Sequence, residues 1–434
     1  MSRQDDVNFL ETFFNRHQSI SIVQLNWTDY SGVVRTRFVP HQRALDLANG
    51  SSYYLAQNCM IIPIATAPKC WTEQPERWNL CPDWSSIRIC GYNQKHAFVM
   101  CCVDQVGPEK RFSQCPRKLL QKTIEDFAGV GMGKILVGFE IEFVLLDEND
   151  NLYKPMDRVV GYSRTKGLRG KTLDLLEEVL DALSVSGIQV HHFHTEIDDQ
   201  VEIALSPLDP VAAIDTLLLA QETIRTIFSR HNLKATMAPK PLLQGTHNGC
   251  HMHLSFSEDA SLVQHFVAGV LTKLHSLCAI GMANYDGYVR SEHDEAGVYI
   301  GWGTENREFP IRKVDDTHWE YRFMDFTANL YLFAATLFLS GKKGIQDRID
   351  LKWKDCQVYP EPLGPRERFV EYGITDSMPV SLQTALLSYT SDEDLRAWLG
   401  DGMFSQYADV KQKEVEHFGV MAEEERRKKF VEYF

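Results

Sequence analysis

The segment KILVGFEIEFVLLD, residues 134–147, decides the fold, because its polar and apolar side chains alternate over the length of a β-strand. A strand points successive side chains to opposite faces of its sheet. Glu140 and Glu142 therefore share one face, and their apolar neighbours take the other. Two interpretations stay open for this segment alone. The acids face solvent, as on one side of many antiparallel sheets, or they line a site that holds cations.

A second segment, GCHMHLSF at residues 249–256, alternates in the same way. His251, His253 and Ser255 share one face, and apolar residues occupy the opposite one. Two histidines at this spacing on a strand can bind a metal ion, although purely structural histidine pairs also have it. This segment alone does not distinguish a metal site from a structural histidine pair.

Two more segments place ionisable groups on strand faces. One puts Glu320 and Arg322 on the same face, which by itself predicts only a salt bridge. The other, residues 190–205, reads as two strands around an Asp-Asp turn. That hairpin is expected to bring Glu196 opposite Glu202.

Together the four segments predict a metal site. A strand face with several acids cannot be buried without cations. Five carboxylates and one imidazole form an oxygen-rich ligand set, which favours Mg²⁺ or Mn²⁺ over zinc and a pair of ions over a single one. The predicted ligands are Glu140, Glu142, Glu196, Glu202, His251 and Glu320.

Basic residues accompany the acidic segments, as an anionic substrate requires. Arginine pairs bidentately with carboxylate and phosphate. Carboxylates, paired divalent cations and arginines are together the groups that transfer a phosphoryl group from a nucleotide. A GxxxxGK[ST] loop is missing from the sequence, which excludes P-loop chemistry. The basic residues concerned are Lys240, Arg290, Arg307, Arg312 and Arg322.

Composition excludes several other classes of protein. The 434 residues carry a formal net charge of −14, so we expect no nucleic-acid partner. The apolar runs are expected to be shorter than the ~20 residues of a membrane span. Ten scattered cysteines and acidic residues near the start of the sequence lead us to expect reduced thiols, no secretion signal and a cytoplasmic protein.

The pattern along the chain predicts an α+β protein with two domains. Residues 1–105 alternate β-like segments with turn-rich stretches, and a helical pattern begins near Cys115. Helical and strand-like segments then alternate to the end of the sequence. We therefore predict domains at residues 1–108 and 109–434.

Many motifs in order now give a resemblance that covers nearly the whole chain. The sequence resembles the glutamine synthetase family, and in particular its divergent members: the glutamate–amine ligases and a domain of fungal developmental proteins. The motifs that carry the resemblance are LNWTDYSGVVRTR, CPDW, CPR, GFEIEF, HTEIDDQVEI, ATMAPKPLLQGTHNGCHMHLSF, GWGTENREFPIRK, HWEYRFMDFTANLYLFAA, PVSLQTAL and WLG.

The resemblance implies a fold, an assembly and a reaction. The fold is an N-terminal β-grasp domain and a catalytic domain whose funnel-like antiparallel sheet is flanked by helices. The assembly is a homo-oligomer of stacked rings, a decamer or dodecamer, with active sites between subunits. In the reaction, glutamate attacks ATP to give γ-glutamyl phosphate, and ammonia or a larger amine then displaces the phosphate.

The resemblance also implies a role for each site residue. Two or more Mg²⁺ or Mn²⁺ ions are expected, one near glutamate on Glu142, Glu196 and Glu202, and one near the phosphates of the co-substrate ATP on Glu140, His251 and Glu320. The nucleotide is expected to contact His253, Ser255, Arg307 and Arg312. Glutamate is expected to contact His247, Gly249, Arg290 and Arg322. The expected catalytic residues are Arg307, Arg312 and Glu295, the last being the acid of a flap that closes the site.

Some positions depart from the family pattern. His247 stands in the stretch THNG, where the family has glycine, and Asn49 stands where an aspartate attracts ammonium. Loss of that charge favours a larger amine as substrate. Two other functions remain open: a catalytically silent assembly of structural or regulatory use, and a metal-dependent hydrolase on the same scaffold.

Overall fold

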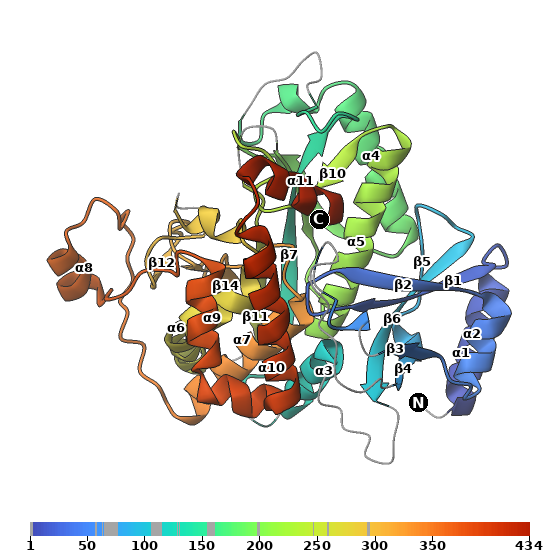
Figure 1. Cartoon of the computed structure of the whole chain (residues 1–434), viewed down its shortest axis with the longest axis horizontal. Helices are drawn as coiled ribbons and strands as arrows, with labels where there is room; N and C mark the ends of the chain where they lie inside the picture. Colours follow the sequence, from blue (N-terminus) through green and yellow to red (C-terminus); the bar gives the residue numbers. More distant parts are fainter. Residues whose placement is uncertain are drawn as a thin grey trace.

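The computed structural model describes residues 3–56, 59–62, 64, 77–105, 115–127, 129, 131–153, 161–197, 200–245, 247–257, 260–292 and 296–434 (Figure 1). The helices are α1 (Arg3–Arg16), α2 (His41–Ala48), η3 (Trp84–Ser86), α3 (Pro116–Phe127), η5 (Thr165–Leu168), α4 (Lys171–Val185), α5 (Pro210–Arg230), α6 (Ala260–Gly281), η6 (Gly287–Ser291), α7 (Leu330–Gln346), α8 (Pro365–Tyr372), α9 (Leu382–Thr390), α10 (Glu393–Phe418) and α11 (Glu423–Tyr433). The strands are β1 (Ile22–Thr28), β2 (Val34–Pro40), β3 (Tyr54–Ala56), β4 (Arg77–Pro82), β5 (Arg88–Ile89), β6 (His96–Gln105), β7 (Ile135–Leu146), β8 (Val190–Thr195), β9 (Gln200–Leu205), β10 (Lys234–Thr236), β11 (Cys250–Phe256), β12 (Trp302–Thr304), β13 (Ile311–Lys313) and β14 (His318–Tyr321).

The strands form two sheets, one between residues 22 and 105 and the other between residues 135 and 321. The N-terminal sheet has six strands in the order β2-β1-β6-β4-β3, with β5 beside β6. The second sheet has eight strands in the order β12-β13-β14-β11-β7-β9-β8, with β10 beside β7, and its pairs are antiparallel except for β12 and β13. This is the mixed α+β organisation that the sequence predicts.

The segment that decides the fold is the long central strand β7. It pairs with β11 on one side and with β9 on the other, so it lies in the middle of the second sheet. Its apolar face is fully buried at Phe139, Ile141 and Phe143. The Phe143 ring contacts Phe228 of α5 at a centroid distance of 5.8 Å. Burial of each such side chain contributes roughly 1.5–3 kcal/mol, which fixes the orientation of β7 and leaves its acids on the opposite face.

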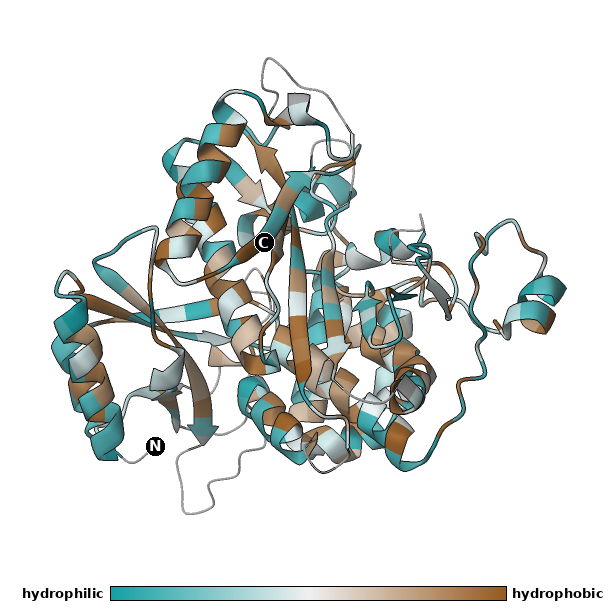
Figure 2. Ribbon diagram, turned by 180° about the vertical axis from the view of Figure 1, so that it is seen from behind, coloured by the Kyte–Doolittle hydropathy of each residue, from teal (hydrophilic) through white to brown (hydrophobic). Residues whose placement is uncertain are grey.

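Helices cover the apolar face of the second sheet. Figure 2 shows apolar residues concentrated along the strands, whereas the outer helices alternate polar and apolar positions. Helix α6 packs against α7 and α9. Its residues 261–281 are long and apolar enough to cross a membrane by length and composition, contrary to the sequence-based expectation. However, 72% of the tested window is buried inside the protein, as in the core helix of a folded domain.

Polar contacts hold the N-terminal sheet against the second half of the chain. Asn329 caps α7 through the backbone N–H of Leu332 and donates to the backbone carbonyl of Asp29 at 2.8 Å. Ser31 donates to Glu414 of α10 at 2.6 Å. The predicted domain boundary at residues 108 and 109 falls outside the described residues and stays a prediction. Nine described cysteines are free thiols, as expected.

Candidate active site

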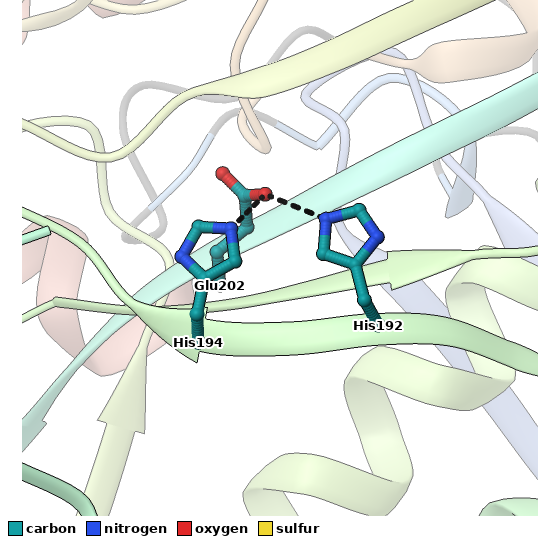
Figure 3. Close-up of side chains that lie close together, drawn as sticks. All are labelled: His192, His194 and Glu202. Carbon is teal, nitrogen blue, oxygen red and sulfur yellow. Dashed lines mark ion pairs between the residues drawn. The ribbon is translucent and has the colours of Figure 1, made fainter. Parts of the chain in front are cut away.

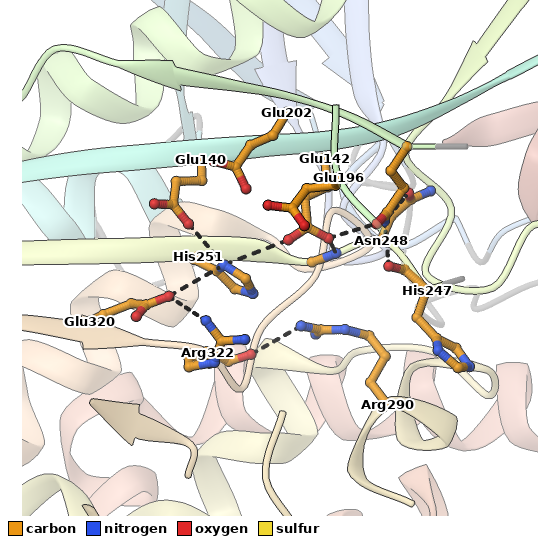
Figure 4. A network of polar contacts seen from close by, with 12 residues as sticks. Glu140, Glu142, Glu196, Glu202, His247, Asn248, His251, Arg290, Glu320 and Arg322 are labelled. Carbon is orange, nitrogen blue, oxygen red and sulfur yellow. Dashed lines mark hydrogen bonds and ion pairs between the residues drawn. The ribbon is translucent and has the colours of Figure 1, made fainter. Parts of the chain in front are cut away.

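The register of the second sheet lines up the polar residues of four strands on one face. Glu142 of β7 lies directly opposite Glu202 of β9. On the other side of β7, Glu140 lies opposite His251 of β11. One pair further along, His253 lies opposite Glu320 of β14. The four segments found in the sequence therefore meet on one surface, which Figure 4 shows from close by.

Glu140 and Glu320 lie on the side of the site where the protein supplies positive charge. We call these two acids with His251, His253, Arg312 and Arg322 the paired side. His251 Nδ1 lies 2.9 Å from Glu140 and 3.4 Å from Glu320. His253 Nε2 lies 3.1 Å from the other oxygen of Glu140.

The fully buried carboxylate of Glu320 accepts from two arginines. Arg312 donates at 2.8 Å and Arg322 at 2.5 Å. Arg312 also contacts Glu305. Arg312, which the sequence predicts to hold phosphate, is thus engaged by two acids of its own chain.

The cations of the paired side stabilise its carboxylates in the charged form. Burial by itself raises the pKa of Glu140, but hydrogen bonds from His251 and His253 outweigh it and hold the pKa well below its usual range. Burial also raises the pKa of Glu320, but the Arg322 and His251 charges outweigh it, so the pKa of Glu320 is lowered as well. The pKa of His253 is raised, since Glu140 outweighs the opposing effect of burial.

The other three glutamates form the acid side, defined as Glu142, Glu196 and Glu202. Glu142 and Glu202 are buried, and Glu196 follows directly after β8. Among the residues that the structure describes, no lysine or arginine forms an ion pair with these three. Burial, together with repulsion from Glu202 and Glu142, raises the pKa of Glu196 to about 7. His194 lies 3.3 Å from Glu202 and 3.7 Å from Glu196. The three acids thus outnumber the positive charge that this imidazole can place beside them.

The β8–β9 hairpin has a different register from the one expected. His194, not Glu196, lies opposite Glu202, and Thr195 lies opposite Val201. Glu196 closes the end of the hairpin through its backbone N–H to Gln200. It still reaches the acid side, as Figure 4 shows. The turn residues 198–199 are outside the described residues.

A buried amide network positions Glu142. Gln200 donates to Glu142 at 3.2 Å and to Asn248 at 2.9 Å. Asn248 in turn donates to two backbone carbonyls at the end of β10 and just after it, those of Thr236 and Ala238. Sequence reasoning missed both amides. The sequence signal for them is only that Gln200 stands two residues before Glu202 and that Asn248 stands three residues before His251.

Gly249 lies where a side chain has no room. Its backbone N–H donates to Glu142 at 2.6 Å. A Cβ at this position meets His251 Nε2 at 2.6 Å and Arg290 at 2.8 Å. The neighbouring backbone carbonyl, at His247, accepts from Gln200 at 2.5 Å. The predicted substrate residues Gly249 and His247 therefore touch the network that holds the acid side.

The two predicted carboxylate-binding arginines lie next to each other under the site. Arg290 of η6 is 1% exposed and donates to the backbone carbonyls of Met324 at 2.7 Å and Arg322 at 3.2 Å. Arg322 contacts Glu320, as described above. Figure 4 shows both guanidinium groups on the same side of the glutamates.

A cavity of about 230 Å³ opens beside the paired side. Glu140, His253 and Ser255 line it, which are residues that the sequence assigns to one metal and to the nucleotide. His318, which sequence reasoning missed, also lines it and lies 2.9 Å from His253 Nδ1.

Two further residues are predicted to be catalytic, Arg307 and Glu295. Arg307 lies in the turn between β12 and β13, where its exposed side chain makes no hydrogen bond or ion pair within the described part of the chain. Glu295, the predicted flap acid, falls outside the described residues. Sequence reasoning also missed His192 and His194, whose rings face Glu202 from β8.

The residues present fit a pair of hard divalent cations. Five carboxylates and one imidazole converge, which is an oxygen-rich donor set. The acid side carries Glu196, whose pKa burial and repulsion from the neighbouring glutamates raise to about 7. Gly249 keeps the space between Glu142, His251 and Arg290 free of side-chain atoms. These observations support the predicted Mg²⁺ or Mn²⁺ pair.

Comparisons with known proteins identify the family of this chain. Residues 113–430 match the family model for the glutamine synthetase catalytic domain. The chain is 31% identical to protein fluG of Emericella nidulans over all of this chain, but it spans only 51% of that protein. It is 27% identical to a glutamine synthetase of Pyrococcus abyssi, over 95% of this chain and 94% of that one.

A solved structure gives the same fold over the full length. The structure titled GmaS/ADP complex superposes with a TM-score of 0.83 at 22% identity, over 96% of this chain and 98% of that chain. This likeness confirms the expected α+β fold. The family match over residues 113–430 confirms the resemblance, and the similarity to protein fluG agrees with its fungal branch. The chain belongs to the glutamine synthetase family.

Proposed function

We propose that this chain is an ATP-dependent ligase that joins glutamate to an amine through γ-glutamyl phosphate. The observation that carries the proposal is the convergence of six side chains from β7, β9, β11, β14 and the end of β8 on one face, with no lysine or arginine paired to the acid side in the described part of the chain. A buried surplus of carboxylates is costly unless cations neutralise it. Cations that bind there neutralise the carboxylates. The same cations can bind anionic substrates and assist their reaction.

The cavity beside Glu140 supports a nucleotide on the paired side. It is lined by His253 and Ser255, as the motifs predict. The solved relative with the same fold holds ADP according to its title. In this arrangement the exposed Arg307 is available for phosphate oxygens, whereas Arg312 reaches them only by leaving Glu305 or Glu320.

Divalent cations held by the two groups of glutamates supply electrostatic stabilisation of the charge that develops on the transferred phosphoryl group. The chain itself orients the reactants. Arg290 and Arg322 offer positive charge for the carboxylates of glutamate, next to the backbone turn at Gly249. The γ-carboxylate oxygen then attacks the γ-phosphorus, and the bond to ADP breaks.

The second step needs a neutral amine and a site without water. The amine attacks the γ-carbonyl carbon, phosphate leaves, and the amine gives up a proton to a general base. We propose Glu295 as this base and as the acid of the flap, and only its sequence motif supports this role. Water has to be excluded at this stage, because it would hydrolyse the acyl phosphate.

The loop proposed to recognise the amine lies far from this chain's own site. Asn49 follows directly after α2, which Figure 1 shows at one edge of the molecule, away from β11 and β14. This placement supports a ring assembly in which the loop of one subunit completes the site of its neighbour. An uncharged asparagine there supports an amine larger than ammonia, and glutamine synthesis remains the second candidate.

The proposal is tested by ADP release from the full-length protein with ATP, glutamate and Mg²⁺ or Mn²⁺. The reaction is run with ammonia and with a panel of mono- and polyamines, and the product masses are measured. We expect amine-dependent ADP release and a γ-glutamyl amide. Glu142→Gln should abolish this activity, and Glu178→Gln, at an exposed position of α4, should retain it.

Three other results have defined meanings. No turnover with any amine supports the catalytically silent assembly. ADP or phosphate release without amide formation supports the hydrolase. Turnover with ammonia alone shows that Asn49 does not exclude ammonium and that the protein is a glutamine synthetase in activity.

A further inference from the structure

A second cluster of side chains that can bind a metal lies on β8 and β9 and includes Glu202 of the acid side (Figure 3). His194 Nε2 lies 3.3 Å from Glu202 Oε1, and His192 Nε2 lies 3.8 Å from the same oxygen. The two imidazoles stack with a centroid distance of 5.4 Å and an interplanar angle of 9°. All three ligand atoms lie within 4.8 Å of one another. Three donors at such separations need only small movements to surround one ion.

Hydrogen bonds at the far side of each ring orient the two histidines. His194 Nδ1 lies 3.1 Å from the backbone carbonyl of Thr195, which can only accept, so Nδ1 carries a proton. His192 Nδ1 lies 2.8 Å from Nδ1 of His191. In its neutral form His194 then offers the Nε2 lone pair toward Glu202. His192 does the same when its Nδ1 donates to Nδ1 of His191. Such outer hydrogen bonds are typical of histidines that bind metals.

A bulge in β8 produces this arrangement. The register shifts between Val190, opposite Leu205, and His192, opposite Ala204. An extra residue in one strand re-aims the side chains beside it. As a result His191 and His192, although adjacent in sequence, both line the cavity next to Glu140.

We propose that His192, His194 and Glu202 bind one divalent transition-metal ion of the zinc class, in addition to the Mg²⁺ or Mn²⁺ pair. Two imidazoles and one carboxylate are the ligand set of zinc sites that keep a fourth position open. Nitrogen donors favour zinc-class ions over Mg²⁺. The His192 side chain is 45% exposed, so the open position faces the cavity and accepts water.

This site shares Glu202 with the acid side. A zinc-class ion on Glu202 withdraws negative charge from the neighbouring glutamates, so its occupancy is coupled to cation binding there. The inference itself does not depend on turnover, since a structural or silent protein with these side chains binds the same ion. Without the ion, a proton on His194 Nε2 can lie between this nitrogen and Glu202.

Cobalt(II) binding tests the site, because Co²⁺ with few ligands and mixed N/O donors absorbs visible light whereas Mg²⁺ does not. The full-length protein is titrated with Co²⁺ in a large excess of Mg²⁺. We expect one Co²⁺ per chain with a visible band. His192→Gln should remove the band and weaken Co²⁺ binding by about 100-fold or more.

Two matched variants locate the ion. His231→Gln changes a histidine of similar exposure that pairs with Glu178 and should leave the Co²⁺ band unchanged. Glu140→Gln disrupts the other histidine-containing set, Glu140, His253 and Glu320, and should also leave it unchanged. Loss of the band in Glu140→Gln but not in His192→Gln overturns the inference, as does the lack of a Co²⁺ band in the unaltered protein. Ligase activity is measured separately, so failure of one proposal leaves the other intact.

Discussion

The paired side and the acid side have similar glutamates but opposite electrostatic states. Glu140 and Glu320 contact imidazole and guanidinium groups, and their pKa values lie well below the usual range. Glu196 lies near other carboxylates and 3.7 Å from His194, and burial together with repulsion from those carboxylates raises its pKa to about 7. The protein thus neutralises one side itself and leaves the other to an added cation. Glutamates of the paired side therefore both stabilise the fold and can bind a cation, whereas those of the acid side serve mainly to bind a cation.

The strongest test of this contrast is removal of a carboxylate from the paired side. Glu320→Ala takes away the acid that Arg312 and Arg322 contact in the interior. Breaking a buried ion pair by removing one partner costs about 3–5 kcal/mol. We expect the free energy of unfolding to fall by this amount in chemical denaturation without metal. A change below ~1 kcal/mol would show that the arginines do not depend on Glu320.

The same kind of change on the acid side should affect activity and not stability. Glu142→Gln removes one of several repelling charges and keeps a group that can accept from Gln200. Metal-free stability should stay within ~1 kcal/mol of the unaltered protein, while kcat falls by about 100-fold or more for lack of a cation ligand. Denaturation and steady-state kinetics on one preparation measure both. Equal losses of stability in Glu142→Gln and Glu320→Ala would remove the contrast.

The raised pKa of Glu196 predicts a pH dependence of cation affinity. The folded protein keeps this proton up to about pH 7, whereas the unfolded chain loses it near its ordinary pKa of 4.5. The metal-free protein therefore loses stability as the pH rises between these values. Cations bind the ionised form, so Mn²⁺ affinity should rise by at most about tenfold per pH unit up to pH 7 and then level off. Calorimetry at several pH values measures it, and Glu196→Gln should flatten the curve.

The smallest effect is expected at Arg307. Its side chain is exposed, and in the described ranges it pairs with nothing, so Arg307→Gln should leave the melting temperature unchanged. A role on the nucleotide phosphates predicts a several-fold higher KM for ATP at low ionic strength. Steady-state kinetics over a range of ATP concentrations would show it. An unchanged KM would remove Arg307 from the site.

Local alternation was enough to predict most of one face of the site. Glu140, Glu142, His251, His253 and Glu320 all lie on strands with a strict period of two, so their side follows from their apolar neighbours. The alternation within one strand decides on which face each side chain lies. This prediction therefore needs no knowledge of which strands pair.

Features that depend on pairing between strands could not be predicted. The register of β8 and β9, with its bulge near His191, decides that His194 and not Glu196 lies opposite Glu202. The amides Gln200 and Asn248 meet only in the folded chain, 48 positions apart in sequence. The expectation of short apolar runs misses α6 because polar residues such as Gln264 and Lys273 interrupt its apolar run, whereas its average composition is apolar enough for a membrane span.

The central claim is that the acid side needs an added cation and the paired side supplies its own charge. Equilibrium Mn²⁺ binding, followed by electron paramagnetic resonance of the free ion, tests it most directly in the unaltered protein and in Glu196→Gln. The account predicts at least two bound Mn²⁺ per chain, one of which is lost or weakened at least about tenfold in Glu196→Gln while the other is unchanged. Identical Mn²⁺ binding in both proteins would contradict it.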